Sequence, residues 1–81
     1  MTRLSPARRR LLECIRDHGP HFGVVQDLLW REHRVSCDRA QANLKSAEFK
    51  GQVEVKRPNR ARASTWTVAL TEAGRKALEQ P

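Results

Sequence analysis

The sequence has few cysteines and no long hydrophobic run, and each absence excludes a class of protein. The two cysteines, Cys14 and Cys37, are too few for the disulfide framework of a small secreted domain, so we expect both to be free thiols in a reducing compartment. No segment approaches the roughly 18 to 20 consecutive apolar residues that cross a bilayer, and no apolar signal segment follows the N-terminal arginines. We therefore expect a cytoplasmic protein without a membrane partner.

Features that mark common enzyme classes are also absent. The chain has no glycine-rich phosphate-binding loop, no pair of carboxylates suited to general acid and base catalysis, and no serine or cysteine with a recognisable base and orienting acid. With 81 residues it is also too short to enclose a substrate cleft easily. We predict that it is not an enzyme, and we expect neither a cofactor nor a small-molecule effector.

Acidic residues are scarce, and two basic stretches contain none. The chain has 16 lysines and arginines against nine aspartates and glutamates, which gives a net charge of +7. Half of the basic side chains lie in the two acid-free stretches, which comprise Arg3, Arg8, Arg9 and Arg10, and then Lys56, Arg57, Arg60 and Arg62. Such a local excess builds a positive field over part of the surface and favours a polyanionic partner.

Apolar residues spaced three and four apart predict three helices, over 6–18, 24–33 and 36–51. Residues 21–23 are too few to assign and form either a turn or a brief edge strand. The faces expected to be buried carry Ala7, Leu11, Leu12, Cys14 and Ile15 in the first helix, Val25, Leu28 and Leu29 in the second, and Cys37, Ala40, Leu44 and Ala47 in the third.

Serine and glycine residues, which favour helix ends, stand at the ends of the predicted helices. Ser5 and Ser36 can each accept a hydrogen bond from an unpaired amide at a helix start. Gly19 and Gly51 are placed to end the first and third helices, and we expect Gly19 to adopt a left-handed conformation.

The apolar period changes from 3.6 to 2 after residue 51, which predicts two strands, 53–56 and 65–70, joined by a basic loop. Thr71 is placed to cap a last helix over 72–79. The residues expected to face the core are Val53, Val55, Trp66, Val68, Leu70, Ala73, Ala77 and Leu78. The whole chain, residues 1–81, is predicted to form one α+β domain, with a three-helix core, a two-stranded hairpin and a short C-terminal helix.

Two segments resemble winged helix-turn-helix proteins. Residues 35–53 contain Leu44, an apolar residue three positions later and then a glycine and a valine, and they resemble the recognition helix and first wing strand of winged-helix transcription regulators. Residues 70–78 resemble the segment that closes the wing in regulators of the multiple-antibiotic-resistance and phenolic-acid type. In that pattern Gly74 implies close packing. The chain lacks the long extra helix with which those families dimerise, so we expect a monomer or a weak homodimer.

The resemblance implies sequence-specific binding to double-stranded DNA, as in a small bacterial or phage transcriptional regulator. The third helix would enter the major groove, and the hairpin, as a wing, would lie on the backbone or in a minor groove. Arginine, lysine and glutamine are the side chains that contact guanine and adenine edges there. The candidate DNA-binding residues are Arg39, Gln41, Ala42, Lys45 and Ser46 on the helix, and Lys56, Arg57, Arg60 and Arg62 on the wing.

Three alternatives remain open. An RNA-binding module is disfavoured by the small number of aromatic residues, two phenylalanines and two tryptophans, most of which we expect in the core. A protein-interaction module is favoured by one apolar residue, Phe49, on the outward face of the third helix. A structural zinc ion would use cysteine and histidine ligands, although their spacing matches no strong zinc pattern; the candidates are Cys14, His18, His21, His33 and Cys37.

Overall fold

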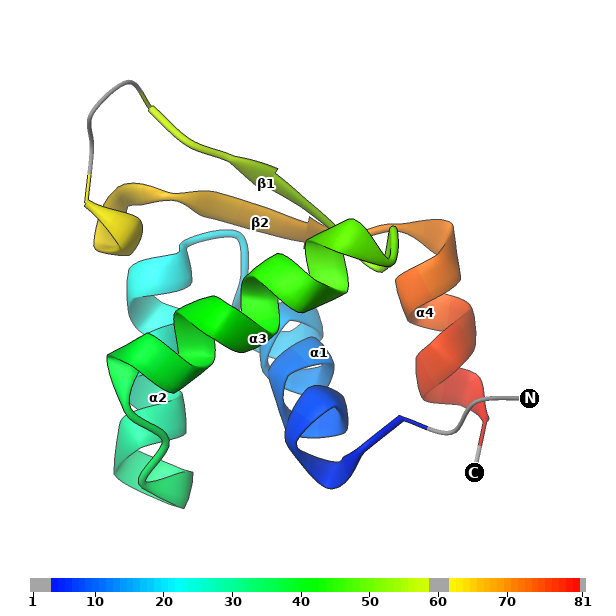
Figure 1. Cartoon of the computed structure of the whole chain (residues 1–81), viewed down its shortest axis with the longest axis horizontal. Coiled ribbons are helices and arrows are strands. Elements are labelled where there is room, and N and C mark those ends of the chain that lie inside the picture. The colour runs from blue at the N-terminus through cyan, green and yellow to red at the C-terminus, as the bar shows by residue number, and fades with distance from the viewer. Residues whose placement is uncertain (1–3, 59–61, 81) are drawn as a thin grey trace.

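The computed structural model describes residues 4–58 and 62–80 of the chain (Figure 1). These residues form four α-helices, a two-stranded antiparallel sheet and one short 3-10 helix, η1. In chain order the elements are α1 (Pro6–His18), α2 (Phe22–His33), α3 (Cys37–Phe49), β1 (Val53–Lys56), η1 (Ala63–Thr65), β2 (Thr67–Leu70) and α4 (Glu72–Glu79). The predicted α+β class and order of elements are therefore confirmed.

Three predicted helix caps are present. The hydroxyl groups of Ser5, Ser36 and Thr71 each accept a hydrogen bond from the backbone N–H three residues later, at 3.1, 3.2 and 3.1 Å. Each bond satisfies an amide that has no partner within its own helix. The prediction for Gly19 was wrong, because its φ of −62° is not left-handed.

The second helix begins at Phe22, two residues earlier than predicted, because the residues before it pair with β2. His21 forms an isolated antiparallel bridge with Thr67. The Phe22 N–H donates to the Trp66 carbonyl at 2.9 Å, and the Val68 N–H donates to the Pro20 carbonyl at 2.7 Å. The second strand also starts later than predicted, at Thr67, since residues 63–65 form η1.

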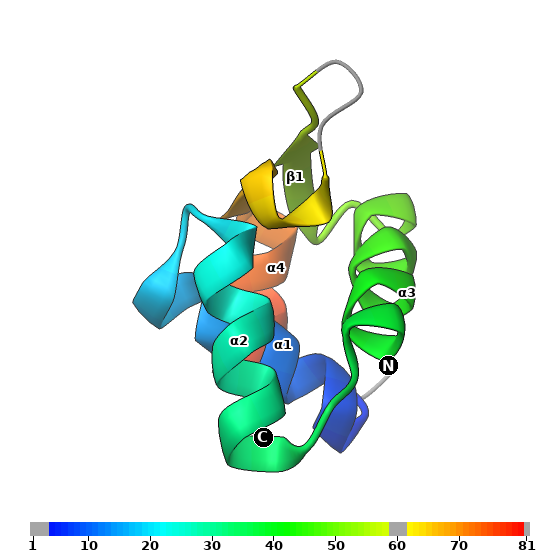
Figure 2. The same cartoon turned by 90° about the vertical axis from the view of Figure 1, so that its left-hand side faces the viewer.

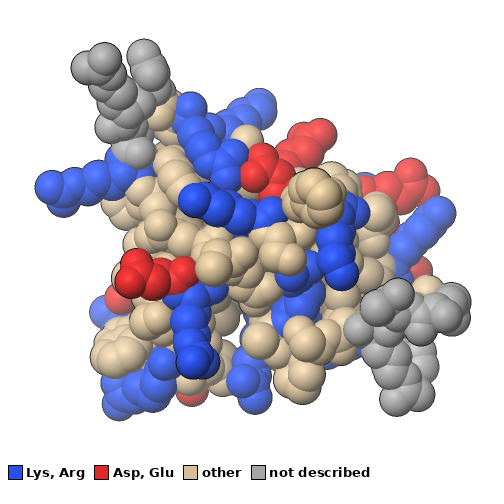
Figure 3. All heavy atoms as spheres, viewed as in Figure 1, with Lys and Arg blue, Asp and Glu red and all other residues tan. Residues whose placement is uncertain are grey.

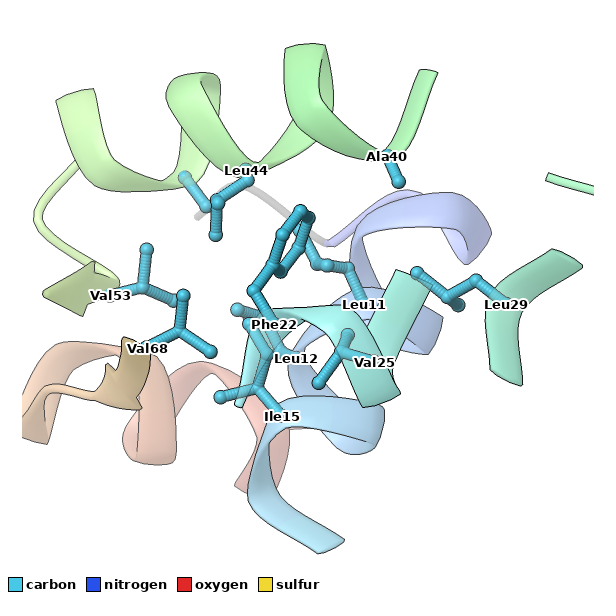
Figure 4. Close-up of a cluster of buried hydrophobic side chains, with 11 residues drawn as sticks. Leu11, Leu12, Ile15, Phe22, Val25, Leu29, Ala40, Leu44, Val53 and Val68 are labelled. Carbon is cyan, nitrogen blue, oxygen red and sulfur yellow. The ribbon is translucent and has the colours of Figure 1, made fainter. Parts of the chain in front are cut away.

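Helices α1, α2 and α3 and both strands contribute to one hydrophobic core (Figure 4). Phe22 is completely buried at its centre, against side chains from α1, α2 and α3 and from both strands. The core residues are Leu11, Leu12, Ile15, Phe22, Val25, Leu29, Ala40, Leu44, Ala47, Val53 and Val68. The apolar periodicity therefore identified most of the residues that hold the elements together.

Three small residues predicted to face the core are exposed: Ala7, Cys37 and Ala73. Each lies at the first or second position of its helix, and its side chain faces solvent there. Trp30, near the end of α2, is also 48% exposed. A residue at a helix end can thus match the apolar period without being buried.

The close packing predicted at Gly74 is present. A Cβ atom at this position would lie less than 3.0 Å from the carbonyl oxygen of Gln52, in the turn between α3 and β1. Thr71 donates to the same turn, from its N–H to the Gln52 carbonyl at 3.1 Å and from its hydroxyl to the Gly51 carbonyl. The start of α4 is therefore held against the end of α3. None of the helices in residues 4–58 and 62–80 is both long and apolar enough to cross a membrane.

Candidate nucleic-acid interface

Helix α3 lies on one side of the molecule, with its outer face uncovered (Figures 1 and 2). Its buried line of Ala40, Leu44 and Ala47 packs on the core and leaves the opposite face to solvent. Of the candidate residues on this helix, Gln41 is half-buried and the others are exposed, namely Arg39, Ala42, Lys45 and Ser46. The structure therefore presents all five predicted helix positions on or beside the outward face.

Long polar side chains lie on the outward face of α3 and on its flanks. None of the hydrogen bonds or ion pairs between described residues involves the side chains of Arg39, Gln41 or Lys45. Long polar side chains without internal partners are available to donate to base edges or phosphate oxygens.

Asn43, by contrast, is held by α1. It accepts a hydrogen bond from Arg8 Nε at 2.6 Å and donates to the Ala7 carbonyl at 3.2 Å. A second nitrogen of Arg8 donates to Gln52 Oε1 at 2.8 Å. Arg8 therefore ties α1 to both α3 and the turn before β1, and its partial burial lowers the pKa of its guanidinium.

The N-terminal basic stretch is thus partly structural. Arg9 donates to the carbonyl of Leu78, at 3.2 Å, and to that of Gln80, so that it caps the C-terminal end of α4. These bonds engage two nitrogens of its guanidinium, so Arg9 is less free to contact a phosphate. Arg3 lies outside the described residues. No local pattern in the sequence indicates either arginine's partners, which are 35 to 71 residues away.

The hairpin projects from the body next to α3 (Figures 1 and 2). Its register pairs Val53 with Leu70 and Val55 with Val68, so that Val53 and Val68 are buried and Lys56 is exposed. Arg62, immediately before η1, is also exposed. The remaining predicted residue of the loop, Arg60, lies outside the described residues.

Arg57 corrects one prediction, which was that the basic loop has no acid nearby. Its guanidinium forms two hydrogen bonds with the Glu48 carboxylate, at 2.8 and 3.0 Å, and lies 4.6 Å from the centre of the Trp66 ring. Trp66 in turn stacks on the buried Phe22, with ring centres 6.1 Å apart. The turn at Gly51, whose φ is +75°, brings β1 back toward α3 and makes the ion pair reachable.

The Glu48–Arg57 pair fixes the hairpin to the last turn of α3. The hydrogen bonds from Arg57 lower the pKa of Glu48, and the same bonds raise the pKa of Arg57. Arg57 can still meet a phosphate, because about a third of its side chain is exposed. Its charge is, however, already balanced by the carboxylate.

Basic side chains predominate on the face that carries α3 and the hairpin (Figure 3). The exposed lysines and arginines of these elements are Arg39, Lys45, Lys50, Lys56, Arg57 and Arg62. Since only Arg57 among them pairs with an acid in the described residues, the face retains a positive excess.

The residues considered for zinc do not form a site. Cys14, His18 and His33 line a cleft between α1 and α2, but Cys37 lies elsewhere, next to Val24 and Trp30. Within residues 4–58 and 62–80, no three histidine, cysteine or acidic side chains lie close enough together to bind one metal ion. Burial, with Glu32 and Asp17 nearby, raises the pKa of Cys14 to about 11, so this thiol is protonated at neutral pH.

Comparison of the chain with protein-family models, with curated proteins and with solved structures found no match. The case for a function therefore comes from the geometry and charge of this face.

Proposed function

We propose that this protein is a winged helix-turn-helix domain that binds double-stranded DNA in a sequence-specific manner, as a small transcriptional regulator does. The observation that carries the proposal is a polar face of α3, with long side chains that have no partner among the described residues, beside a basic hairpin. The Glu48–Arg57 pair joins the helix to the hairpin. A helix supplies base contacts and the hairpin, as the wing, supplies backbone contacts in this arrangement.

The dimensions of α3 suit the major groove. Its 13 residues make a helix about 20 Å long, and the groove is about 12 Å wide, enough to admit one helix. Arg39 and Lys45 have the reach and donors for guanine O6 and N7, and Gln41 has the donor and acceptor for adenine. Ala42 and Ser46 are short enough to allow close approach of the helix to the bases.

The wing supports a contact of a different kind. Lys56 and Arg62 are exposed on either side of residues 59–61 and have no ion-pair partner in the described part of the chain. Basic side chains in such a position bind phosphates or enter a narrow minor groove, whose potential is strongly negative. The wing thus contributes affinity that depends on salt more than on sequence.

The experiment is a titration of the protein with duplex DNA, single-stranded DNA and duplex RNA at several salt concentrations, followed by selection from random duplexes. We expect the tightest binding to duplex DNA, with affinity that falls steeply as salt increases, and enrichment of a defined sequence. Preference for RNA, or selection without enrichment, would contradict the proposal.

A protein partner is the second candidate, because one observation favours it. Phe49 is 93% exposed and Trp30 is 48% exposed, whereas most of the aromatic residues were expected in the core. Exposed aromatic rings are common in protein interfaces. Failure to bind any nucleic acid at low salt would place this candidate first.

A further inference from the structure

Phe49, the last residue of α3, is the most exposed large apolar residue among those the structure describes, at 93%. An isolated apolar side chain on a surface is common and carries no meaning by itself. Phe49 differs from such isolated residues in its position on the helix.

Phe49 lies in the middle of the outward face. At 3.6 residues per turn, Ala42, Lys45 and Phe49 fall within an arc of about 60°, opposite the buried Leu44 and Ala47. Along the axis, the three residues span about 10 Å, the rise of about three base pairs. An apolar ring therefore lies in line with a lysine on the face that we propose for the major groove.

The surroundings of Phe49 are basic. Lys45 and Lys50 are exposed beside it, and the adjacent acid, Glu48, is neutralised by Arg57. An occupant of this surface must be negatively charged and must also offer an apolar group to the ring. Duplex DNA offers both in its major groove, where thymine displays its C5 methyl group.

We infer that Phe49 recognises thymine, by packing its ring on the C5 methyl group of a thymine at the C-terminal end of α3. This inference rests on the proposed function, because it requires α3 to enter the major groove. It adds to α3 an apolar contact with thymine, which differs in kind from the hydrogen bonds that Arg39, Gln41 and Lys45 can make to guanine and adenine.

The test uses the duplex that wild-type protein selects from a random library. Each thymine in turn is replaced by deoxyuridine, which removes the methyl group and leaves the hydrogen-bonding edge unchanged. We expect about fourfold weaker binding at one position, the loss that corresponds to one buried methyl-sized group. Phe49→Ala should bind the thymine duplex at least fourfold more weakly and should no longer distinguish thymine from uracil at that position.

A matched control is Val24→Ala, which shortens another exposed apolar side chain, 47% exposed, on α2. It should keep the wild-type response to uracil. The thermal midpoint of Phe49→Ala should equal that of wild type, because the ring is 93% exposed and adds little to the core. A lower affinity of this variant then reflects a lost contact and not a lost fold.

Two results separate this inference from the proposed function. If wild type binds its selected duplex but tolerates uracil at every thymine, or if Phe49→Ala retains the full response to uracil, the thymine contact is wrong and DNA binding stands. If wild type binds no duplex, both are overturned.

Discussion

The two cysteines show how strongly position determines the chemistry of a residue. The Cys14 thiol is partly buried between α1 and α2, 3.8 Å from the Val25 carbonyl oxygen, and burial with Glu32 and Asp17 nearby raises its pKa to about 11. Cys37 is exposed at the first residue of α3. Only a thiolate reacts readily with alkylating reagents, so the two thiols should differ in reactivity.

We predict that a maleimide reagent at pH 7 modifies Cys37 well before Cys14 in the folded protein. Mass spectrometry of the peptides, taken at increasing times, measures the two rates. Cys37→Ser should remove the fast reaction, and unfolding in denaturant should make the two rates similar. Equal rates in the folded protein would contradict the burial of Cys14.

Protonation of Glu48 should make the attachment of the hairpin to α3 depend on pH. Its folded-state pKa is lowered, first by the hydrogen bonds from Arg57 and then by the charge of that residue. The ion pair therefore adds stability above the ordinary glutamate pKa of about 4.3, and this stability is lost as pH falls through the lowered folded-state value.

We predict that the free energy of unfolding of wild type decreases more between pH 6 and pH 3 than that of Glu48→Gln, which has no charge to lose. Urea denaturation at each pH measures this difference. Glu72→Gln is the matched control, because the Glu72–Lys76 pair is more exposed than the Glu48–Arg57 pair. Parallel pH curves for wild type and Glu48→Gln would show that the ion pair contributes nothing.

At the scale of elements, the contact between α4 and the turn before β1 depends on the absence of a side chain at Gly74. A glycine inside a helix normally costs about 1 kcal/mol relative to alanine, so alanine would ordinarily stabilise such a position. Here a Cβ atom would overlap the Gln52 carbonyl, which is backbone and is held by the Thr71 N–H.

We predict that Gly74→Ala destabilises the protein by about 1 to 3 kcal/mol, the usual range for overpacking, in the direction opposite to helix propensity. Chemical denaturation measures the change in the free energy of unfolding. Ala73→Gly, at the exposed neighbouring position, should cost about 1 kcal/mol through propensity alone. A stabilising Gly74→Ala would mean that α4 does not pack closely on the turn.

The elements themselves could be predicted because their signals are local. Ser5, Ser36 and Thr71 cap helices within three residues, and the change of apolar period marks the start of β1. The early start of α2 could not be predicted, because Phe22 is fixed by a hydrogen bond to Trp66, 44 residues later.

The candidate interface also combines features that local patterns predict with features that they do not. The exposure of Ala42, Lys45 and Phe49 on the outward face of α3 follows from helical periodicity. The Glu48–Arg57 pair depends on how the turn at Gly51 returns the chain, and the contact of Arg8 with Asn43 depends on the packing of α1 on α3. Such long-range pairs leave no spacing pattern in the sequence.

At the scale of the whole molecule, the two basic stretches have different roles. In the N-terminal stretch, Arg8 and Arg9 form hydrogen bonds within the chain and hold α3 and α4. The side chains of Lys56 and Arg62 form no hydrogen bond or ion pair with other described residues. Lys56 and Arg62 are therefore more available to a partner than Arg8 and Arg9 are.

The most direct test of DNA binding through α3 compares two double variants with equal loss of charge. Arg39→Ala with Lys45→Ala removes two basic side chains from the outward face of α3, and Arg16→Ala with Lys76→Ala removes two exposed ones from α1 and α4. Fluorescence anisotropy with the selected duplex, at one fixed salt concentration, measures the dissociation constant of each. We predict at least tenfold weaker binding for the α3 variant and less than threefold for the control, in line with the cost of losing base contacts. Equal losses in the two variants would contradict binding through α3 and would attribute the affinity to overall charge.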